Sequence, residues 1–275
     1  RLGINFANDK GKLFRLEATK LFYPLNLLFG LLNFEALGFI NRLSLLKFFL
    51  RLYFYSDEDL KKLTVHQWLL LEGQNEEIRK TFWDFLEIGA LNTGTSKASA
   101  KVFSDILKQI FFTGSKSATI ILPLQGLSES YCIEAQTFIE NNGGVVNLSE
   151  QVLELEVGDG RVTKIITSKR TITDFDFVIS SIPWFTFDKL QTSEINLLTS
   201  AGKPRRFLPD INLDFEHSSI LSLHIWLHKN YLAEEFYGLI GSPVQWVFNH
   251  HDHITIVISD ANDIIEKSKE ELFEM

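Results

Sequence analysis

The hydrophobic periodicity of the chain changes once, near Thr119, and this change limits the class of fold. Before it, apolar residues such as Ile78, Phe82 and Phe85 recur three or four positions apart, which is the spacing of one helix face. After it, short apolar runs and alternating patterns take over, and these are typical of β-strands. We therefore expect an α/β protein whose first part is helical and whose second part contains a mixed sheet.

The first half carries polar residues that are suited to begin helices. Their side-chain oxygens can accept a hydrogen bond from the first free backbone N–H groups of a helix. Acidic residues follow two of them, at Asp57–Asp59 and at Glu76–Glu77, where the helix dipole favours negative charge. Gly73 is placed to end one of these helices. The predicted starting residues are Ser56, Thr64, Asn75 and Ser96.

The second half contains a strong hairpin signal. Segments 151–157 and 161–168 alternate around Gly158-Asp159-Gly160, and Gly and Asp tolerate the positive φ angles of tight hairpin turns. Two further helices are expected over residues 126–142 and 261–273. The other predicted strands cover residues 145–148, 177–182, 219–227, 244–248 and 254–259.

Composition excludes some functions. The net charge is −8, and the longest basic cluster is Lys203, Arg205 and Arg206, so nucleic acid is not an expected partner. Cys132 is the only cysteine, which excludes an internal disulfide and is typical of a reducing compartment. We expect Cys132 to be a small buried apolar residue, with a reactive thiol as the alternative.

The segment Leu21–Phe34 is the most apolar stretch and contains no charged residue. It is too short to cross a bilayer, which needs about 20 apolar residues. One interpretation is a loop followed by core helices. The other is a membrane-contacting face or the mouth of a lipid channel, because an apolar helix flanked by Lys and Arg can lie on a bilayer surface.

Several phrases of the sequence form an ordered set: Pro24–Leu28, Phe82–Leu86, Ala90–Thr93, Ala98–Ala100, Leu122–Ser128 and Gly241–Phe248. Taken together and in this order, they resemble the hydroxysqualene dehydroxylases, also called squalene-associated FAD-dependent desaturases. The resemblance extends over nearly the whole chain, and Phe85 departs from it because the family usually has Pro there.

A broader pattern resembles the FAD amine-oxidase and phytoene-desaturase superfamily. It comprises Gly143–Leu148, Val152, the Gly-Asp-Gly-Arg hairpin and Asp176–Pro183. The resemblance implies a two-domain α/β fold with FAD as cofactor, in which backbone at Val152 contacts the adenine. Residues Ser180, Ser181 and Pro183 would pass near the flavin, and we assign Trp184, Gln245 and Trp246 to the same cofactor site.

The glycine-rich G-x-G-x-x-G loop that places an FAD pyrophosphate at a helix N-terminus is absent from these 275 residues. We therefore expect the chain to be an internal portion of a longer flavoprotein. The resemblance divides it into a mainly helical substrate-binding section (1–118), part of the FAD-binding domain (119–185), and the sheet and helix of the substrate domain (186–275).

The implied reaction is the reduction of hydroxysqualene to squalene by reduced flavin, a step in hopanoid-precursor metabolism. Because the cofactor does the difficult chemistry, the protein need only supply a dry, oriented slot. No catalytic residue and no metal site is assigned. Each aromatic candidate has core packing as its alternative interpretation. The candidates for substrate contact are Trp68, Phe82, Trp83, Asn92, Thr93 and Trp226.

Two alternative functions remain open at this point. A carotenoid or phytoene-type desaturase or isomerase would share the fold, whereas a flavin-free, membrane-associated lipid-binding protein would explain the missing glycine loop. Expected partners are an isoprenoid substrate, the synthases of the same pathway and, peripherally, a membrane. The expected location is cytoplasmic, at the inner face of the cell membrane.

Overall fold

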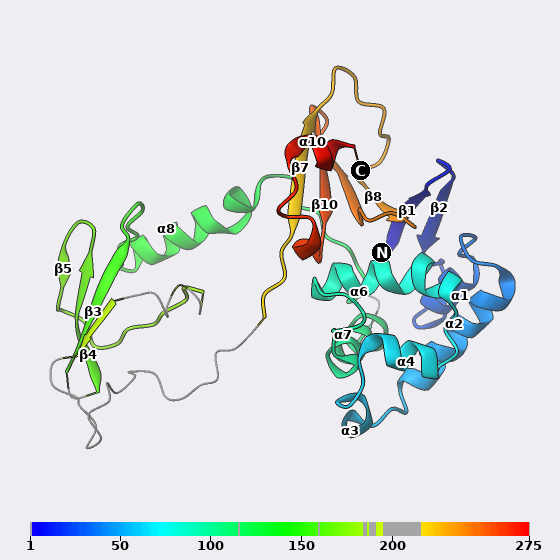
Figure 1. Cartoon of the computed structure of the whole chain (residues 1–275), viewed down its shortest axis with the longest axis horizontal. Coiled ribbons are helices and arrows are strands. Elements are labelled where there is room, and N and C mark those ends of the chain that lie inside the picture. The colour runs from blue at the N-terminus through cyan, green and yellow to red at the C-terminus, as the bar shows by residue number, and fades with distance from the viewer. Residues whose placement is uncertain are drawn as a thin grey trace. The chain divides into compact units, whose positions relative to one another are not determined.

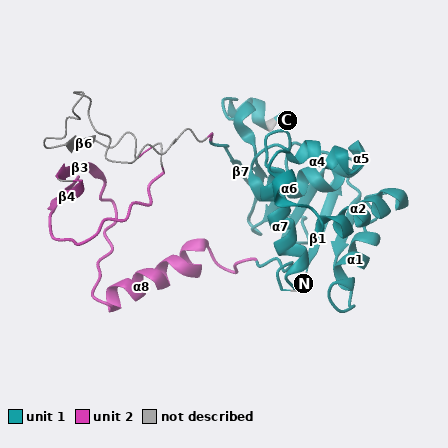
Figure 2. Cartoon of the chain, turned by 90° about the horizontal axis from the view of Figure 1, so that it is seen from below, with its two compact units in different colours: residues 1–121, 217–275 teal, residues 122–216 magenta. Residues whose placement is uncertain are grey.

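The computed structural model describes residues 2–114, 116–158, 160–183, 186, 191–194 and 216–274. The chain divides into two compact units, which Figure 2 shows in different colours. Unit 1 comprises residues 1–121 and 217–275, and unit 2 comprises residues 122–216. Unit 1 is therefore assembled from two separate stretches of sequence.

Unit 1 contains a six-stranded mixed sheet with the order β2-β1-β8-β9-β10-β7. Neighbouring strands are antiparallel except β1 and β8, which are parallel. The strands are β1 (Gly3–Asn8), β2 (Leu13–Glu17), β7 (Leu221–Trp226), β8 (Phe236–Ile240), β9 (Trp246–Asn249) and β10 (His253–Ile258).

The helices of unit 1 come mainly from its first stretch and gather on one side of the sheet (Figure 1). They are α1 (Leu25–Leu32), α2 (Phe39–Leu52), α3 (Asp57–Leu60), α4 (Val65–Leu71), α5 (Glu76–Ile78), the π-helical turn η1 (Arg79–Trp83), α6 (Asp84–Leu91) and α7 (Ala100–Phe112). After β10 follow a short 3-10 turn, η3 (Ala261–Asp263), and α10 (Lys269–Phe273).

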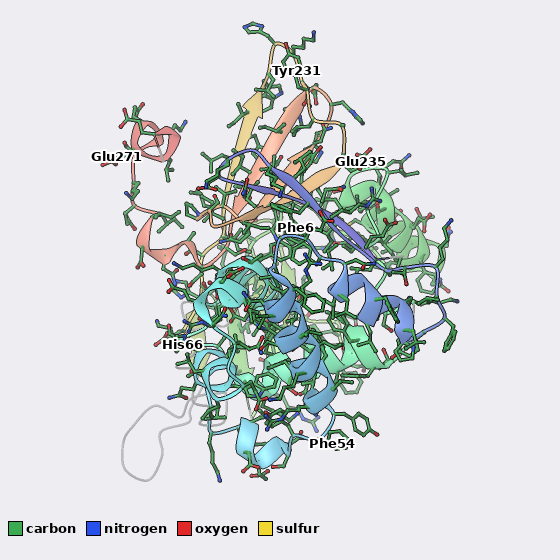
Figure 3. The ribbon with its side chains drawn as sticks, turned by 90° about the vertical axis from the view of Figure 1, so that its right-hand side faces the viewer. Phe6, Phe54, His66, Tyr231, Glu235 and Glu271 are labelled. Atoms are coloured by element: carbon green, nitrogen blue, oxygen red, sulfur yellow. The ribbon has the colours of Figure 1, made fainter. Side chains whose placement is uncertain are left out.

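One face of the sheet joins the helices in a single hydrophobic core. Ile4, Phe6 and Leu16 are buried in this core, and Phe236 and Trp246 pack against it. Figure 3 shows Phe6 where the strands meet the helical layer. Paired residues on neighbouring strands point to the same side, so the register assigns these residues to one face, which we call the helix face.

Unit 2 contains a second sheet and one long helical segment. The sheet has the order β5-β4-β3-β6. Its strands are β3 (Val152–Gly158), β4 (Arg161–Thr167), β5 (Thr171–Ile172) and β6 (Gln191–Glu194), and the helical segment is η2 (Ser128–Cys132) followed by α8 (Ile133–Asn141). Among its described large apolar residues, only Leu155 and Val157 are buried. Most of the described large apolar side chains of this unit are therefore not buried by other residues of the chain.

The local signals in the sequence predict most of these elements. Thr64 forms a complete capping box with Gln67, Asn75 accepts from Ile78 N–H, and Ser56 accepts from Asp59 N–H. The hairpin at residues 151–168 is present as β3 and β4. The helix expected from Ser96 begins three residues later, because Ser99 is the residue whose side chain accepts from Val102 N–H.

Other expectations were wrong. Residues 145–148 and 177–182 form no strand, because each run lacks a pairing partner among the described residues. The helix expected over 261–273 is broken into η3 and α10, since Ser268 caps a separate helix. Strands β1, β2, β5, β6 and β8 were not predicted at all. Cys132 is exposed rather than buried, since the helical segment that carries it buries no residue.

The apolar segment Leu21–Phe34 belongs largely to the core. Helix α1 buries Asn26, Leu27, Gly30 and Leu31, and Phe34 is also buried. This supports the interpretation as core helix for most of the segment, although Phe22 is 73% exposed. Among the described residues, no helix has the length and apolar character needed to cross a membrane.

The joint between sheet and helices leaves no room for a side chain at Gly238. A Cβ atom there would lie 2.8 Å from the Phe6 ring and 2.9 Å from the Phe85 ring. We predict that Gly238→Ala lowers the free energy of unfolding by about 1–3 kcal/mol, because both buried rings would have to shift. Urea unfolding measures this change. Gly3→Ala is the control, since its Cβ would make only an ordinary contact at 3.9 Å; equal losses in the two variants would contradict the prediction.

Candidate functional site

Two of the phrases that carry the family resemblance meet in unit 1. Helix α6 from the first phrase packs on strand β9 from the second, with the Phe85 and Trp246 rings 4.4 Å apart. Gly89 allows this approach, because a Cβ there would lie 3.3 Å from the indole nitrogen of Trp246. Trp246 also stacks on Phe248 at 6.2 Å. Segments more than 150 positions apart are therefore held together by aromatic packing.

A cavity of about 320 Å³ lies beside this contact, between the η1–α6 segment and the turn that joins β8 to β9. Its lining is mixed: two charged side chains face apolar ones and a buried amide. The lining residues are Lys80, Asp84, Phe85, Ile88, Leu239, Gly241, Ser242, Pro243 and Gln245.

The side chain of Gln245 forms its hydrogen bonds with the protein backbone. Its Oε1 accepts from the N–H of Ser259 at 2.7 Å, and its Nε2 donates to the carbonyl of Pro243 at 2.9 Å. The side chain is buried, so these bonds fix the start of β9 against the end of β10. Gln245 thus shapes the cavity wall, and its predicted cofactor role stays a prediction.

Asn92 joins the end of α6 to the segments just before β7 and just after β10. It adopts a left-handed conformation with φ of 50°. Its Nδ2 donates to the carbonyl of Ser218 at 2.9 Å, and its Oδ1 accepts from the N–H of Asp260 at 2.8 Å. Both polar atoms of the amide are therefore engaged. Neighbouring Thr93 donates its hydroxyl to the carbonyl of Leu91 at 3.2 Å and keeps the capacity to accept a hydrogen bond.

The aromatic candidates of the first half lie deep in the helical core. Trp68 and Trp83 are fully buried, and Phe82 is nearly so. The indole N–H of Trp83 donates to Oε1 of Gln74 at 2.9 Å, and Phe48 packs against both tryptophans. These contacts favour core packing for all three residues, and their substrate role stays a prediction.

Trp226 lies apart from the cavity, at the end of β7, where it is 69% exposed. It stacks on His253 with ring centroids 5.2 Å apart, and His253 stacks in turn on His250. Among the described residues, no group of three or more His, Cys, Asp or Glu side chains is arranged to hold a metal ion. Gln245 and Trp246 therefore lie together at or beside the cavity, whereas Trp226 lies away from it.

Two carboxyl groups on α6 were missed by sequence reasoning. Asp84 lines the cavity, and burial raises the pKa of its carboxyl against the opposing influence of Arg79, His66 and Lys80. Glu87 is fully buried, and neither of its carboxyl oxygens has a hydrogen-bond partner. Burial, together with the charges of Asp84 and Asp260, raises the pKa of Glu87 to about 8. Glu87 is therefore a neutral acid at neutral pH.

The sheet face opposite the helices is mainly apolar on strands β7 to β10, where Asn249 is its polar member, whereas β1 and β2 place Asn5, Arg15 and Glu17 on the same face. Cross-strand register places the odd-numbered residues of β7 beside the even-numbered residues of β10, and Val247 of β9 follows beside Ile256. All of these side chains are buried or half-buried, and none is charged. We call this set the open face: Leu221, Leu223, Ile225, Tyr237, Leu239, Val247, Ile254, Ile256 and Ile258. Leu239 belongs both to the open face and to the cavity wall.

The remaining predicted cofactor residues lie in unit 2. Val152 is 38% exposed at the start of β3, and Ser180, Ser181 and Pro183 are exposed. Ile179 beside them is 94% exposed. None of these residues lines the cavity described above, so their contact with FAD stays a prediction. Trp184 lies outside the described residues.

Comparison with known proteins supports one family. No established family model matches the chain. Hydroxysqualene dehydroxylase of Zymomonas mobilis is 19% identical over 202 residues, which cover 74% of this chain and 45% of that protein. Hydroxysqualene dehydroxylase of Sinorhizobium fredii is 22% identical over 190 residues, which cover 68% and 41%. The chain thus spans less than half the length of these relatives.

Solved structures define the fold. A putrescine oxidase bound to putrescine aligns with a TM-score of 0.61 at 15% identity, over 98% of this chain and 60% of that one. An oxidoreductase from Methanosarcina mazei aligns with a TM-score of 0.62 at 15% identity, over 88% and 56%. The chain therefore has the fold of the FAD-dependent amine-oxidase class, as its sequence predicts.

In sequence, the chain is similar to these two hydroxysqualene dehydroxylases, each of which it matches over more than two thirds of its own length. This confirms the family resemblance of the sequence. The predicted division at residues 118 and 185 concerns function, and the two compact units do not test it.

The neutral state of Glu87 predicts a pH-dependent stability. Its pKa is about 8 in the folded protein and 4.5 when it is solvated, so the folded state binds an extra proton between these values. The contribution of Glu87 to the stability of the folded protein is then largest below about pH 4.5, and this contribution is lost as the pH rises through about 8. We predict that Glu87→Gln flattens the fall of Tm between pH 5 and pH 9, and thermal unfolding followed by circular dichroism measures it.

The exposed glutamate Glu77 provides the matched control for this measurement. Glu77→Gln should keep the pH dependence of the parent protein. The assignment is contradicted by a Glu87→Gln variant whose Tm falls with pH as steeply as that of the Glu77→Gln variant.

Proposed function

We propose that the chain is part of an FAD-dependent oxidoreductase of isoprenoid metabolism that reduces hydroxysqualene to squalene, a hopanoid precursor. The observation that carries the proposal is the combination of two hydroxysqualene dehydroxylase relatives with an amine-oxidase fold. The open face supports it, because its side chains are uncharged and, apart from Tyr237, aliphatic, which suits a hydrocarbon substrate.

The residues that would hold FAD are those that the family resemblance indicates. Backbone at Val152 would pair with the adenine, and Ser180, Ser181 and Pro183 would allow a close approach of the chain to the cofactor. Trp184, Gln245 and Trp246 complete the proposed set. When bound in its reduced form, FAD would supply the hydride that the reaction needs.

The chain itself would contribute orientation and a proton. The hydrocarbon would lie along the open face, with its hydroxyl near the cavity that Leu239 shares with that face. Replacing the hydroxyl by hydrogen breaks a C–O bond, so the oxygen must leave as water and needs a proton. Asp84 lines the cavity with a raised pKa, which suits it to donate that proton. Thr93 retains a hydrogen-bond acceptor and Asn92 fixes the segment after α6; both lie outside the lining of this cavity, so we propose that they contact the substrate away from its hydroxyl.

The function is tested directly on the whole protein. Bound flavin is quantified by absorbance, and the dithionite-reduced protein is then mixed anaerobically with hydroxysqualene. We predict that squalene, identified by mass spectrometry, forms in proportion to the flavin that is reoxidised. Bound flavin without squalene would favour a carotenoid or phytoene-type desaturase or isomerase. The absence of flavin would favour a flavin-free lipid-binding protein.

The role of Asp84 is tested by Asp84→Asn in the same assay. An amide cannot donate the proton that a carboxylic acid supplies, so we predict a rate of squalene formation about 10²–10⁴ times lower. Flavin content should stay unchanged, because Asp84 is not among the proposed FAD contacts. The rate of the parent protein should also fall as the pH rises through the pKa of Asp84, whereas the variant should show no such step. An Asp84→Asn variant with the parental rate and pH profile excludes this role.

A further inference from the structure

Helix α2 carries large apolar side chains on two opposite faces. One face is buried in the core through Leu45, Phe48, Phe49 and Leu52. The other face is open to solvent, with exposed fractions of 66% at Phe39, 80% at Ile40, 45% at Leu43 and 57% at Leu50. A surface helix of a globular protein normally has polar residues on its outer face, so the outer face of α2 requires an explanation.

The exposed residues form a continuous stripe. At about 3.6 residues per turn, positions 39, 40, 43, 47 and 50 fall within an arc of about 100° on the helix. We call Phe39, Ile40, Leu43, Lys47 and Leu50 the α2 stripe; its centre lies opposite the buried face. Phe54, 83% exposed, follows shortly after the helix at the outer end of the helical layer (Figure 3).

The charges of α2 are all positive. The helix contains Arg42, Lys47 and Arg51 and no acidic residue, although the whole chain has a net charge of −8. Lys47 is exposed within the stripe. Arg42 is fixed by hydrogen bonds to the carbonyls of Leu32 and Leu37, and Arg51 pairs with Glu72 at 3.0 Å. An apolar stripe accompanied by basic side chains fits the interface of an anionic bilayer, where both features contribute to binding.

We propose that the α2 stripe docks the protein on the surface of an anionic phospholipid bilayer. The inference rests on α2 alone and goes beyond the proposed function. A second copy of the chain fits this surface less well, because a two-fold interface would bring two copies of the same positively charged stripe together and bury both Lys47 side chains. The surface differs from the apolar segment Leu21–Phe34, most of which is buried in the core.

The test is sedimentation of the whole protein with vesicles of phosphatidylcholine, either alone or mixed with phosphatidylglycerol. We expect binding to the mixed vesicles that weakens with added salt. The double variant Ile40→Ser, Leu43→Ser should bind at least about a hundredfold more weakly, because two large apolar side chains would no longer be buried in the bilayer. Lys47→Glu should weaken binding to the mixed vesicles by at least about fivefold, since it removes a positive charge from the stripe and adds a negative one.

Leu71→Ser is the matched control, because Leu71 is a large apolar residue of α4 that is 69% exposed outside the stripe. It should bind like the parent protein, and circular dichroism verifies that every variant is folded. No binding of the parent protein to either vesicle overturns the proposal, as does an equal loss in the Leu71→Ser variant. A dimer that the stripe variants dissociate, without vesicle binding, would assign the stripe to a second copy instead. Flavin content and squalene formation are measured in separate assays, so the vesicle-binding result can be interpreted even if the proposed function is wrong.

Discussion

Phe6 and Phe85 meet over Gly238, at a point where a side chain would occupy the space that the two rings fill. This contact commits one face of the six-stranded sheet to the helices. Because side chains alternate along a strand, the same contact directs residues such as Leu223 and Ile256 to the opposite face. The helical core, the cavity beside α6 and the open face all depend on this choice of side.

The arrangement assigns different chemistry to different places. The open face provides aliphatic surface, and the cavity at its end provides a few polar groups, among them Asp84. Glu87, which is buried on α6, is a neutral acid whose carboxyl oxygens have no hydrogen-bond partner. A site with much apolar surface and few titrating groups is what a flavin-dependent reaction on a hydrocarbon requires, because the cofactor performs the redox step.

Sequence reasoning succeeded where a signal is local. The capping box of Thr64 and the hairpin near Gly160 are each encoded within a few residues. It failed where partners come from a distance: Glu87 is perturbed partly by Asp260, 173 positions later, and no local pattern reveals this. Strand β1 pairs with β8 from the other end of the chain. The turn between β1 and β2 did leave a signal, since Asn8 precedes Gly11, a glycine with a φ of 71°.

The proposed function places an isoprenoid on the open face of the unit 1 sheet. Photolabelling tests it most directly, with a C30 isoprenoid alcohol that carries a diazirine group, followed by mass spectrometry of the digested whole protein. The account predicts label on peptides of β7, β9 and β10, at Leu223, Val247 or Ile256, and competition by unlabelled hydroxysqualene. Competed label that falls only on the core helices around Trp68 and Trp83, and not on these strands, would contradict it.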